Sequence, residues 1–463
     1  MNFKPSPITI TKEAPYAEDR LGRKACAEVL TNVLNSAPDG LVLCINGTWG
    51  SGKSTFIEMW RTQLEGDFTT MLFNAWESDF VDDAMVALLG DLQSQAEELA
   101  AKGCPDPAAE KIAVFKRLGS KLVRGALPFA IKAATAGMVD IDNDALKDLL
   151  VDEAGKLAEA QIEAYAEAKA SIAGFKDALT ELAEEIGVSG KPLVIFVDEL
   201  DRCRPPFAVR VLEVIKHFFS VPGVVFVLAL DREQLGHSIK SMYGADMDVG
   251  GYLRRFFDLE FNLPKGNGTT FVGELFRKFG LAEAIEAHSK QSGFTGPFST
   301  QNLVSSLFDA FSCSPRDQEK CFTHYALTKI ASPRARQWSF MNLFMAIVLR
   351  IKQPELYQGL LHGSKTIDDV LIDLSKSKRF LNYLETHGGT YFEWYLRALS
   401  YSGMSSAFLS ELDGARQIGQ GRVDRMDALN ILRSGFDGNL QLPPIGGLRG
   451  IDTAINLVEH FSS

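Results

Sequence analysis

The chain has 463 residues, of which 46% are hydrophobic and 23% charged, as expected for a soluble globular protein of two or three domains. Its net charge of −11 argues against a protein that coats nucleic acid, because such proteins need a basic face. No apolar run is long enough for a membrane helix, the N-terminus has no signal-peptide pattern and the cysteines are scattered, so we expect a cytoplasmic protein with reduced thiols.

Five short apolar runs predict the strands of one sheet. They are residues 41–46, 69–74, 193–198, 224–231 and 256–262. Each run is almost continuously apolar, which is typical of strands buried on both faces, and helical sequence separates them. We therefore predict an α/β fold with a parallel five-stranded sheet and right-handed crossovers.

The first strand leads into Gly47-Thr-Trp-Gly-Ser-Gly-Lys-Ser54, which matches the phosphate-binding pattern G-x-x-x-x-G-K-[ST]. Glycines in this loop allow positive φ values and a close approach of the backbone to an anion. The loop amides would bind phosphates at a helix N-terminus, Lys53 would reach the β and γ phosphates, and Ser54 would ligate Mg²⁺. The predicted nucleotide-binding residues of the loop are Gly47, Thr48, Trp49, Gly50, Ser51, Gly52, Lys53, Ser54 and Thr55.

The stretch from about 85 to 190 is longer than a crossover requires and predicts a helical insertion. Its part from 143 to 187 is strongly acidic. Apolar side chains recur there at spacings of three and four residues and predict one apolar helix face; they are Ile172, Phe175, Leu179, Leu182 and Ile186. This face packs on its own domain or, alternatively, serves as a surface for a partner or for self-association.

The third strand ends in Asp198 and Glu199, at the edge of the sheet that holds the phosphate loop. We predict that Asp198 holds Mg²⁺ through water and that Glu199 polarises an attacking water. The alternative is a pair of acids that simply ends a strand at solvent. Because strand 69–74 comes between the two motifs, the pattern predicts the class of P-loop NTPases that has an additional strand and a catalytic glutamate.

Later polar residues are candidates for completing the γ-phosphate site. Asp231 ends the fourth strand, where it senses that phosphate or orients the water, or else caps the next helix. Arg254 and Arg255 precede the fifth strand and would stabilise the transition state within the chain or in a neighbouring subunit. Alternatively, they only favour a helix dipole. Arg334 lies in a first helical turn, where it opposes the dipole, and this favours a ligand-facing role.

After Pro264 the strand signals stop and the pattern is helical. We predict a P-loop NTPase core at 1–264, a helical lid at 265–350 and a helical C-terminal region at 351–463. The pattern of 265–463 shows no second catalytic constellation.

Several motifs, in this order, resemble the KAP family of P-loop NTPases over roughly residues 15–345. They are AEDRLGR, NGTWGSGKST, LFNAWE, VIFVDELDRCRP, FVLALDREQL, YLRRFF and PRARQWSFMN. The resemblance implies an ATP-hydrolysing, often oligomerising domain, with Gly22 and Arg23 beside the nucleotide base, and in bacteria a frequent link to phage defence or exclusion. The chain departs from the family in having Glu199 where aspartate is common, and an acidic helical segment where many members have membrane helices.

We therefore predict an ATPase that uses ATP and Mg²⁺ and couples hydrolysis to a conformational change of its helical part or to assembly. Its partners would be further copies of the chain or an effector protein, with no membrane. One alternative is a slowly hydrolysing, nucleotide-gated switch or scaffold that recruits an effector. Another is a nucleic-acid-dependent motor, which the shortage of basic clusters disfavours.

Overall fold

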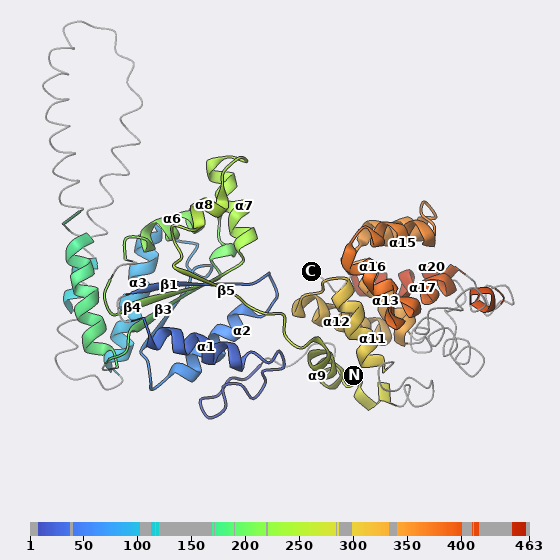
Figure 1. The fold of residues 1–463 in the computed structure, drawn as a ribbon, viewed down its shortest axis with the longest axis horizontal. Coiled ribbons are helices and arrows are strands. Elements are labelled where there is room, and N and C mark those ends of the chain that lie inside the picture. The colour runs from blue at the N-terminus through green and yellow to red at the C-terminus, as the bar shows by residue number, and fades with distance from the viewer. Residues whose placement is uncertain are drawn as a thin grey trace, which may run out of the picture.

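The computed structural model describes residues 8–37, 40–101, 113–115, 117–119, 169–170, 172–188, 190–218, 221–283, 285–286, 299–332, 340–400, 410, 412–415 and 447–459. They form an α/β lobe and a helical lobe that lie side by side (Figure 1). Within this described part, no helix is both long and apolar enough to cross a membrane.

One parallel sheet forms the centre of the α/β lobe. Its strands are β1 (Leu41–Asn46), β2 (Thr70–Asn74), β3 (Leu193–Asp198), β4 (Val224–Leu230) and β5 (Leu259–Asn262), in the spatial order β2-β3-β4-β1-β5. The parallel five-stranded sheet is confirmed, and β1 and β3 have the predicted bounds. The first three residues of the predicted fifth strand, 256–258, are not in β5.

Burial on both faces holds for the three inner strands but not for the outer two. All described residues of β3 and β4 are buried, whereas β2 alternates between buried and half-buried residues and β5 is mostly exposed. The prediction was wrong for β2 and β5 because each has a neighbouring strand on one side only.

The additional-strand topology is present, but a different strand provides it. β4 lies between β1 and β3, while β2 lies at the outer edge beside β3. The run 69–74 comes between the two motifs in sequence and not in space. Because β4 separates the other two strands, the loop after β1 and the acids after β3 meet across the carboxyl end of β4.

Helices cover both faces of the sheet (Figure 1). One face packs against α1 (Lys24–Asn35) and α2 (Lys53–Leu64). The other packs against α3 (Ala84–Ala101), α6 (Pro205–Ile215), α7 (Arg232–Tyr243) and α8 (Val249–Leu253). The two layers give the sheet two separate apolar clusters, which fix its carboxyl edge in place.

The apolar face predicted from Ile172 to Ile186 packs on its own lobe. Residues 172–186 are helical, and the ring centroid of Phe175 lies 4.8 Å from that of Phe115 and 5.2 Å from that of Phe218. These side chains belong to the hydrophobic cluster that covers the sheet. The face is therefore buried within its own lobe and is not a surface for a partner. The remainder of the insertion, including most of the acidic stretch, lies outside the described residues.

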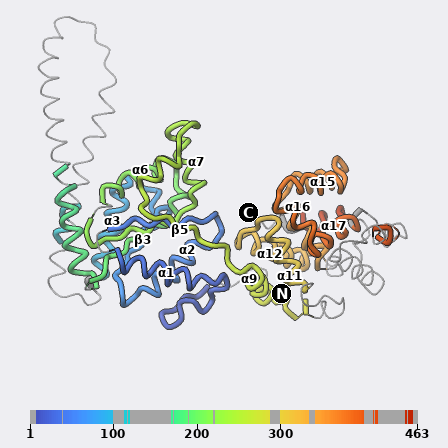
Figure 2. The backbone as a smooth tube through the Cα atoms, viewed as in Figure 1, coloured from blue at the N-terminus to red at the C-terminus, as the bar shows by residue number. Residues whose placement is uncertain are grey.

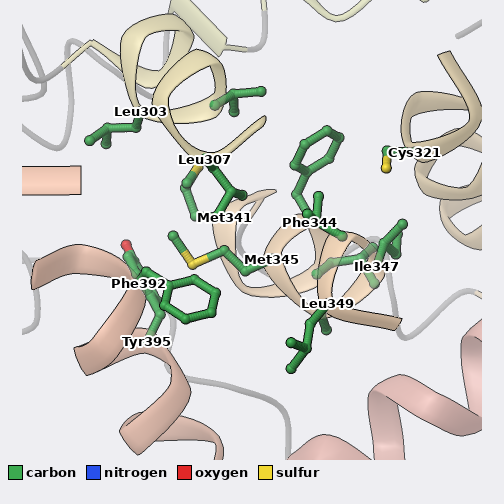
Figure 3. Close-up of a cluster of buried hydrophobic side chains, with 14 of the residues drawn as sticks. Leu303, Leu307, Cys321, Met341, Phe344, Met345, Ile347, Leu349, Phe392 and Tyr395 are labelled. Carbon is green, nitrogen blue, oxygen red and sulfur yellow. The ribbon is translucent and has the colours of Figure 1, made fainter. Parts of the chain in front are cut away.

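The helical lobe has its own core. Its helices are α9 (Gly268–Lys278), α11 (Thr300–Ala310), α12 (Pro315–Ala331), α13 (Phe340–Lys352), α14 (Pro354–His362), α15 (Ile367–Ser375), α16 (Lys378–Leu384), α17 (His387–Ser400) and α20 (Gly447–Glu459). Every residue from Phe340 to Leu349 is buried, so α13 is a central helix that the others surround. Side chains of α11, α12 and α17 pack against it (Figure 3).

Buried side chains from Val272 to Ile455 belong to one hydrophobic cluster. The packing of the described residues therefore shows no domain boundary at residue 350, where we predicted the boundary between the lid and the C-terminal region. The chain reaches this lobe from the end of β5 through residues 263–267 (Figure 2).

Candidate nucleotide-binding site

A cavity of about 260 Å³ lies where the two lobes meet. The α/β lobe contributes its phosphate loop, the acids after β3 and the segment from Glu18 to Arg23, whereas α9 and α12 line the helical side. Its predicted nucleotide-site residues are Arg23, Gly50, Gly52, Lys53, Ser54, Thr55, Asp198 and Glu199. The cavity thus unites the two motifs that the sequence placed together.

The phosphate loop ends at the N-terminus of α2, where Gly52 is the N-cap residue with a φ of 84°. Gly50 also has a positive φ, whereas Gly47 does not. Gly47 instead packs closely, since a Cβ there would lie 3.0 Å from Ser51 Oγ. Lys53 Nζ donates to the carbonyl of Gly47 at 2.5 Å. The lysine side chain therefore lies across its own loop.

The acids after β3 lie beside the start of α2. Ser54 Oγ donates to Glu199 Oε1 at 3.3 Å. Burial raises the pKa of Asp198 to about 6, and hydrogen bonds from Ser54 and from the Glu199 amide oppose that rise. The alternative of two acids ending a strand at solvent fails for Asp198, which is only 6% exposed.

Glu199 has an uncommon backbone conformation for a residue with a side chain. Its φ of 61° and ψ of 22° lie in the left-handed region, which costs an L-residue about 1 kcal/mol. A 3₁₀ turn, η1 (Leu200–Arg202), follows directly. Arg202 Nη1 in this turn lies 2.6 Å from Glu199 Oε1, so the predicted base is ion-paired. This conformation changes the direction of the backbone sharply, so that the Glu199 side chain faces α2.

Two carboxylates fasten Trp49 of the phosphate loop. Asp231 Oδ2 accepts from its backbone N–H at 3.0 Å, and Asp201 Oδ2 accepts from its indole Nε1–H at 2.5 Å. Asp231 Oδ1 also accepts from the amides of Glu233 and Gln234, which confirms that Asp231 caps α7. With both its oxygens bonded to backbone, its predicted γ-phosphate role stays a prediction.

Arg23 connects the loop with the end of the sheet. Its guanidinium donates to the carbonyls of Gly52 at 3.2 Å and Pro264 at 3.4 Å, and burial lowers its pKa to about 10. Gly22 has a φ of 68° and turns the chain into α1. Arg23 lies against the phosphate loop. That Gly22 and Arg23 lie beside the nucleotide base stays a prediction.

The helical side of the cavity approaches the phosphate loop closely. The Arg316 amide donates to the Gly50 carbonyl at 3.3 Å, and a Cβ on Gly50 would lie 2.8 Å from Arg316 Cβ. Ser314 and Asp317 form a capping box around Pro315 and so begin α12 at this point. The approach brings the Arg316 and Glu319 side chains into the cavity lining, where burial raises the pKa of Glu319.

The structure does not bring the predicted Arg254 and Arg255 to this cavity. Arg254 and Arg255 are exposed near the end of α8, and neither is among the described residues that line the cavity. Arg254 is the C-cap residue of α8, as the helix-end alternative requires. Arg334 lies outside the described residues. A role of Arg254 and Arg255 within the same chain is therefore not supported, which leaves the neighbouring-subunit version as a prediction.

Sequence reasoning missed Asp201, Arg202 and Arg316. Asp201 and Arg202 stand two and three positions after Glu199, and this closeness in sequence could have marked them as site residues. Arg316 belongs to a Ser-Pro-Arg triplet at 314–316 that repeats the triplet at 332–334. That repetition, with serine as a cap and proline in the first turn, could have marked α12 as a second candidate for a lid arginine.

The residues present fit a magnesium ion. Mg²⁺ prefers hard oxygen ligands, and it is usually bound by one or two protein groups together with substrate phosphates. The Ser54 hydroxyl and the Asp198 carboxylate supply such oxygens at the start of α2. Among the described residues, no group of three or more His, Cys, Asp or Glu side chains could hold a metal alone. The protein part of the site is thus suited to an ion that arrives with a nucleotide.

The model of the KAP family P-loop domain matches residues 23–390. The chain belongs to the KAP family. Its resemblance to that family is thereby confirmed, and so are its P-loop NTPase fold and its capacity to bind a nucleotide.

Two known relatives match parts of this KAP protein. The phage T7 exclusion protein of Escherichia coli strain K12 is 22% identical over 39% of this chain, and the match spans 24% of that protein's length. An uncharacterised protein of Methanocaldococcus jannaschii is 29% identical over 34% of this chain and 88% of its own length.

Two solved structures align along most of the chain. A Walker-type ATPase of Pyrococcus abyssi has a TM-score of 0.33 at 14% identity, with 98% of this chain and 100% of the other covered. The ORC2 protein of Aeropyrum pernix, in ADPNP–ADP complexes, has a TM-score of 0.34 at 11% identity, with 96% and 95% covered.

Proposed function

We propose that the protein binds ATP with Mg²⁺, hydrolyses it, and couples hydrolysis to movement of the helical lobe. The observation that carries this proposal is the composition of the cavity: the phosphate loop and the acids form one wall, and α9 and α12 of the other lobe form the opposite wall. A nucleotide between them would contact both lobes. Its cleavage would then change how the two walls are held together.

In this mechanism, Lys53 leaves the carbonyl of Gly47 and turns to the β and γ phosphates, while the loop amides bind phosphate oxygens. Ser54 and Asp198 would hold Mg²⁺, and the ion would supply positive charge to offset the charge that develops on the phosphates. Glu199 would orient and polarise the attacking water once its ion pair with Arg202 opens. Arg316, from the helical lobe, would stabilise charge on the γ-phosphate.

The lining of the cavity also contains apolar side chains. Leu21, Met59, Phe271 and Leu275 line it, as does Lys278. Such a surface suits the face of a purine ring, and the backbone of Glu18 to Leu21 offers groups that could read its edge. We propose that the base of the nucleotide lies against this surface, near Arg23. The choice of ATP over GTP is part of the proposal.

Association with further copies or with an effector protein is proposed as well. Arg254 and Arg255 are exposed on the α/β lobe, where they could reach the cavity of a neighbouring copy. The likeness to the phage T7 exclusion protein favours a role in defence against phage, with ATP turnover as the trigger. A slow, nucleotide-gated switch is the second candidate, because the ion pair of Arg202 with Glu199 would hold the base back.

ATP hydrolysis by the purified protein tests these proposals, beside Lys53→Ala and Glu199→Gln and across a range of protein concentrations. Lys24→Ala is the matched control, since the Lys24 side chain is exposed at the start of α1. Turnover should fall by at least about 100-fold in both site variants, whereas Glu199→Gln should still bind ATP. Competition by GTP would measure the preference for ATP.

The concentration series separates the candidates. If turnover per chain rises with concentration and Arg254→Ala with Arg255→Ala removes that rise, the arginines act between copies. If wild type binds ATP but turns over no faster than Glu199→Gln, the catalytic proposal is wrong and the switch takes its place. Salt-dependent DNA binding would support a motor on nucleic acid instead.

A further inference from the structure

Asp201 is a buried acid of the cavity lining to which the catalytic proposal gives no role. It stands in η1, two residues after Glu199, and is 5% exposed. Its Oδ2 accepts from Trp49 Nε1 and lies 3.8 Å from Lys53 Nζ. Its Oδ1 is buried and, among the described residues, has no hydrogen-bond partner.

Fastening the indole of Trp49 does not by itself require a charged side chain. A neutral asparagine oxygen would accept the same N–H, whereas a buried carboxylate is costly unless a cation balances it. The cation nearest to Asp201 is Lys53. The other buried or half-buried cations that line this wall have other partners: Arg202 pairs with Glu199, Arg20 pairs with Glu274, and Arg23 donates to the carbonyls of Gly52 and Pro264.

Asp201 therefore shares a cation with the ligand of the site. Any nucleotide that draws Lys53 toward its β and γ phosphates removes the charge that balances Asp201. It also brings phosphate oxygens, themselves negative, close to a carboxylate that water does not screen. Both effects oppose binding, and both are larger for a triphosphate than for a diphosphate.

We propose that Asp201 is a positioning residue that competes with nucleotide phosphates for Lys53 and thereby weakens the binding of the triphosphate more than that of the diphosphate. This inference rests on the proposed function, because it assumes that Lys53 binds a nucleoside triphosphate. The hydrogen bond to Trp49 does not explain why residue 201 is charged. On this proposal, the charge keeps ATP from binding so tightly that the site stays in one state.

Asp201→Asn tests the inference, since asparagine keeps the shape and an acceptor for Trp49 but removes the charge. Fluorescent ATP and ADP analogues would be titrated with Mg²⁺ into wild type, Asp201→Asn and Trp49→Phe. We expect Asp201→Asn to bind the triphosphate about tenfold more tightly and the diphosphate at most about threefold more tightly, because like-charge repulsion falls with distance. Trp49→Phe, which removes the tether and keeps the charge, should not tighten triphosphate binding.

The outcomes separate the two levels of the proposal. If wild type binds neither nucleotide, the proposed function fails. If wild type binds and Asp201→Asn binds the triphosphate with equal or lower affinity, the competition is wrong and Asp201 is a structural tether. Should Asp201→Asn bind neither nucleotide, Asp201→Ser is measured in the same way, and a loss of diphosphate binding there as well would also overturn the competition.

Discussion

The two walls of the nucleotide cavity are held in different ways. On the α/β side, hydrogen bonds join the phosphate loop to Asp231, which follows β4, and to Asp201 in η1, and the sheet fixes the acids. On the helical side, the contacts with the other lobe among the described residues include an amide of α12 on Gly50, an ion pair of Lys278 with Glu18 and one of Arg20 with Glu274. The difference teaches that the backbone of the α/β wall is preorganised, while its Lys53 and Glu199 side chains still have to change partners. The helical wall is held by contacts that a ligand can replace.

The largest effect should come from the core of the helical lobe. Phe344 is fully buried in α13, and its ring centroid lies 4.9 Å from that of Phe340 and 5.0 Å from that of Phe322. Phe344→Ala should lower stability by about 3–5 kcal/mol and abolish hydrolysis although it leaves the phosphate loop intact. Denaturant unfolding and ATPase assays check this. Phe80→Ala, at an 84% exposed site of the other lobe, is the control. Full activity in Phe344→Ala would show that the helical wall is dispensable.

Arg316→Ala should lower the turnover number by about 10- to 100-fold, because a charge-stabilising arginine is removed from the helical wall. Nucleotide affinity should change less than turnover. The matched control is Lys320→Ala, one turn further along α12 and exposed. Unchanged turnover in Arg316→Ala would return the lid role to Arg334.

Gly266→Ala should disturb the connection between the walls. A Cβ there would lie 2.6 Å from the carbonyl oxygen of Leu21, so the linker or the segment of Leu21 has to shift. We expect a loss of about 1–3 kcal/mol in thermal or denaturant unfolding, with weaker nucleotide binding. Gly90→Ala is the control, because a Cβ there meets nothing within 4 Å and alanine favours the helix α3. Equal stability of both variants would mean that the linker is loose.

Lys278→Ala should have the smallest effect. Its ion pair with Glu18 spans 3.7 Å between partly exposed side chains, and such pairs are worth about 0–1 kcal/mol. Its position in the cavity lining should add at most a few-fold loss of ATP affinity in the same titration. A loss as large as that of Lys53→Ala would show that the helical wall, too, is preorganised.

Sequence correctly predicted where the phosphate loop, Asp198 and Glu199 lie, for a physical reason. The phosphate loop, Asp198 and Glu199 follow buried strands, and local pattern fixes both the strands and the edge at which they end. Even so, the spatial neighbour of β1 was misjudged, because sequence order does not give strand order.

The helical wall could not be predicted to the same depth. Which of several arginines faces the cavity depends on how α12 and α9 pack around α13, and that packing involves side chains from Val272 to Ile455. The pattern of a single helix records which face is apolar but not which neighbour it meets. The capping box of Ser314 and Asp317 was visible in sequence, yet the contact of the Arg316 amide with Gly50 arises only from tertiary structure.

The left-handed backbone conformation of Glu199 sets the stability of the fold against the proposed activity of this residue. Glycine at this position would relieve about 1 kcal/mol of strain, so Glu199→Gly should resist heat slightly better than Glu199→Gln while being equally inactive. Thermal melting of the two variants would measure the difference. Selection for a sturdier fold alone would thus favour glycine over the glutamate that we propose as the base.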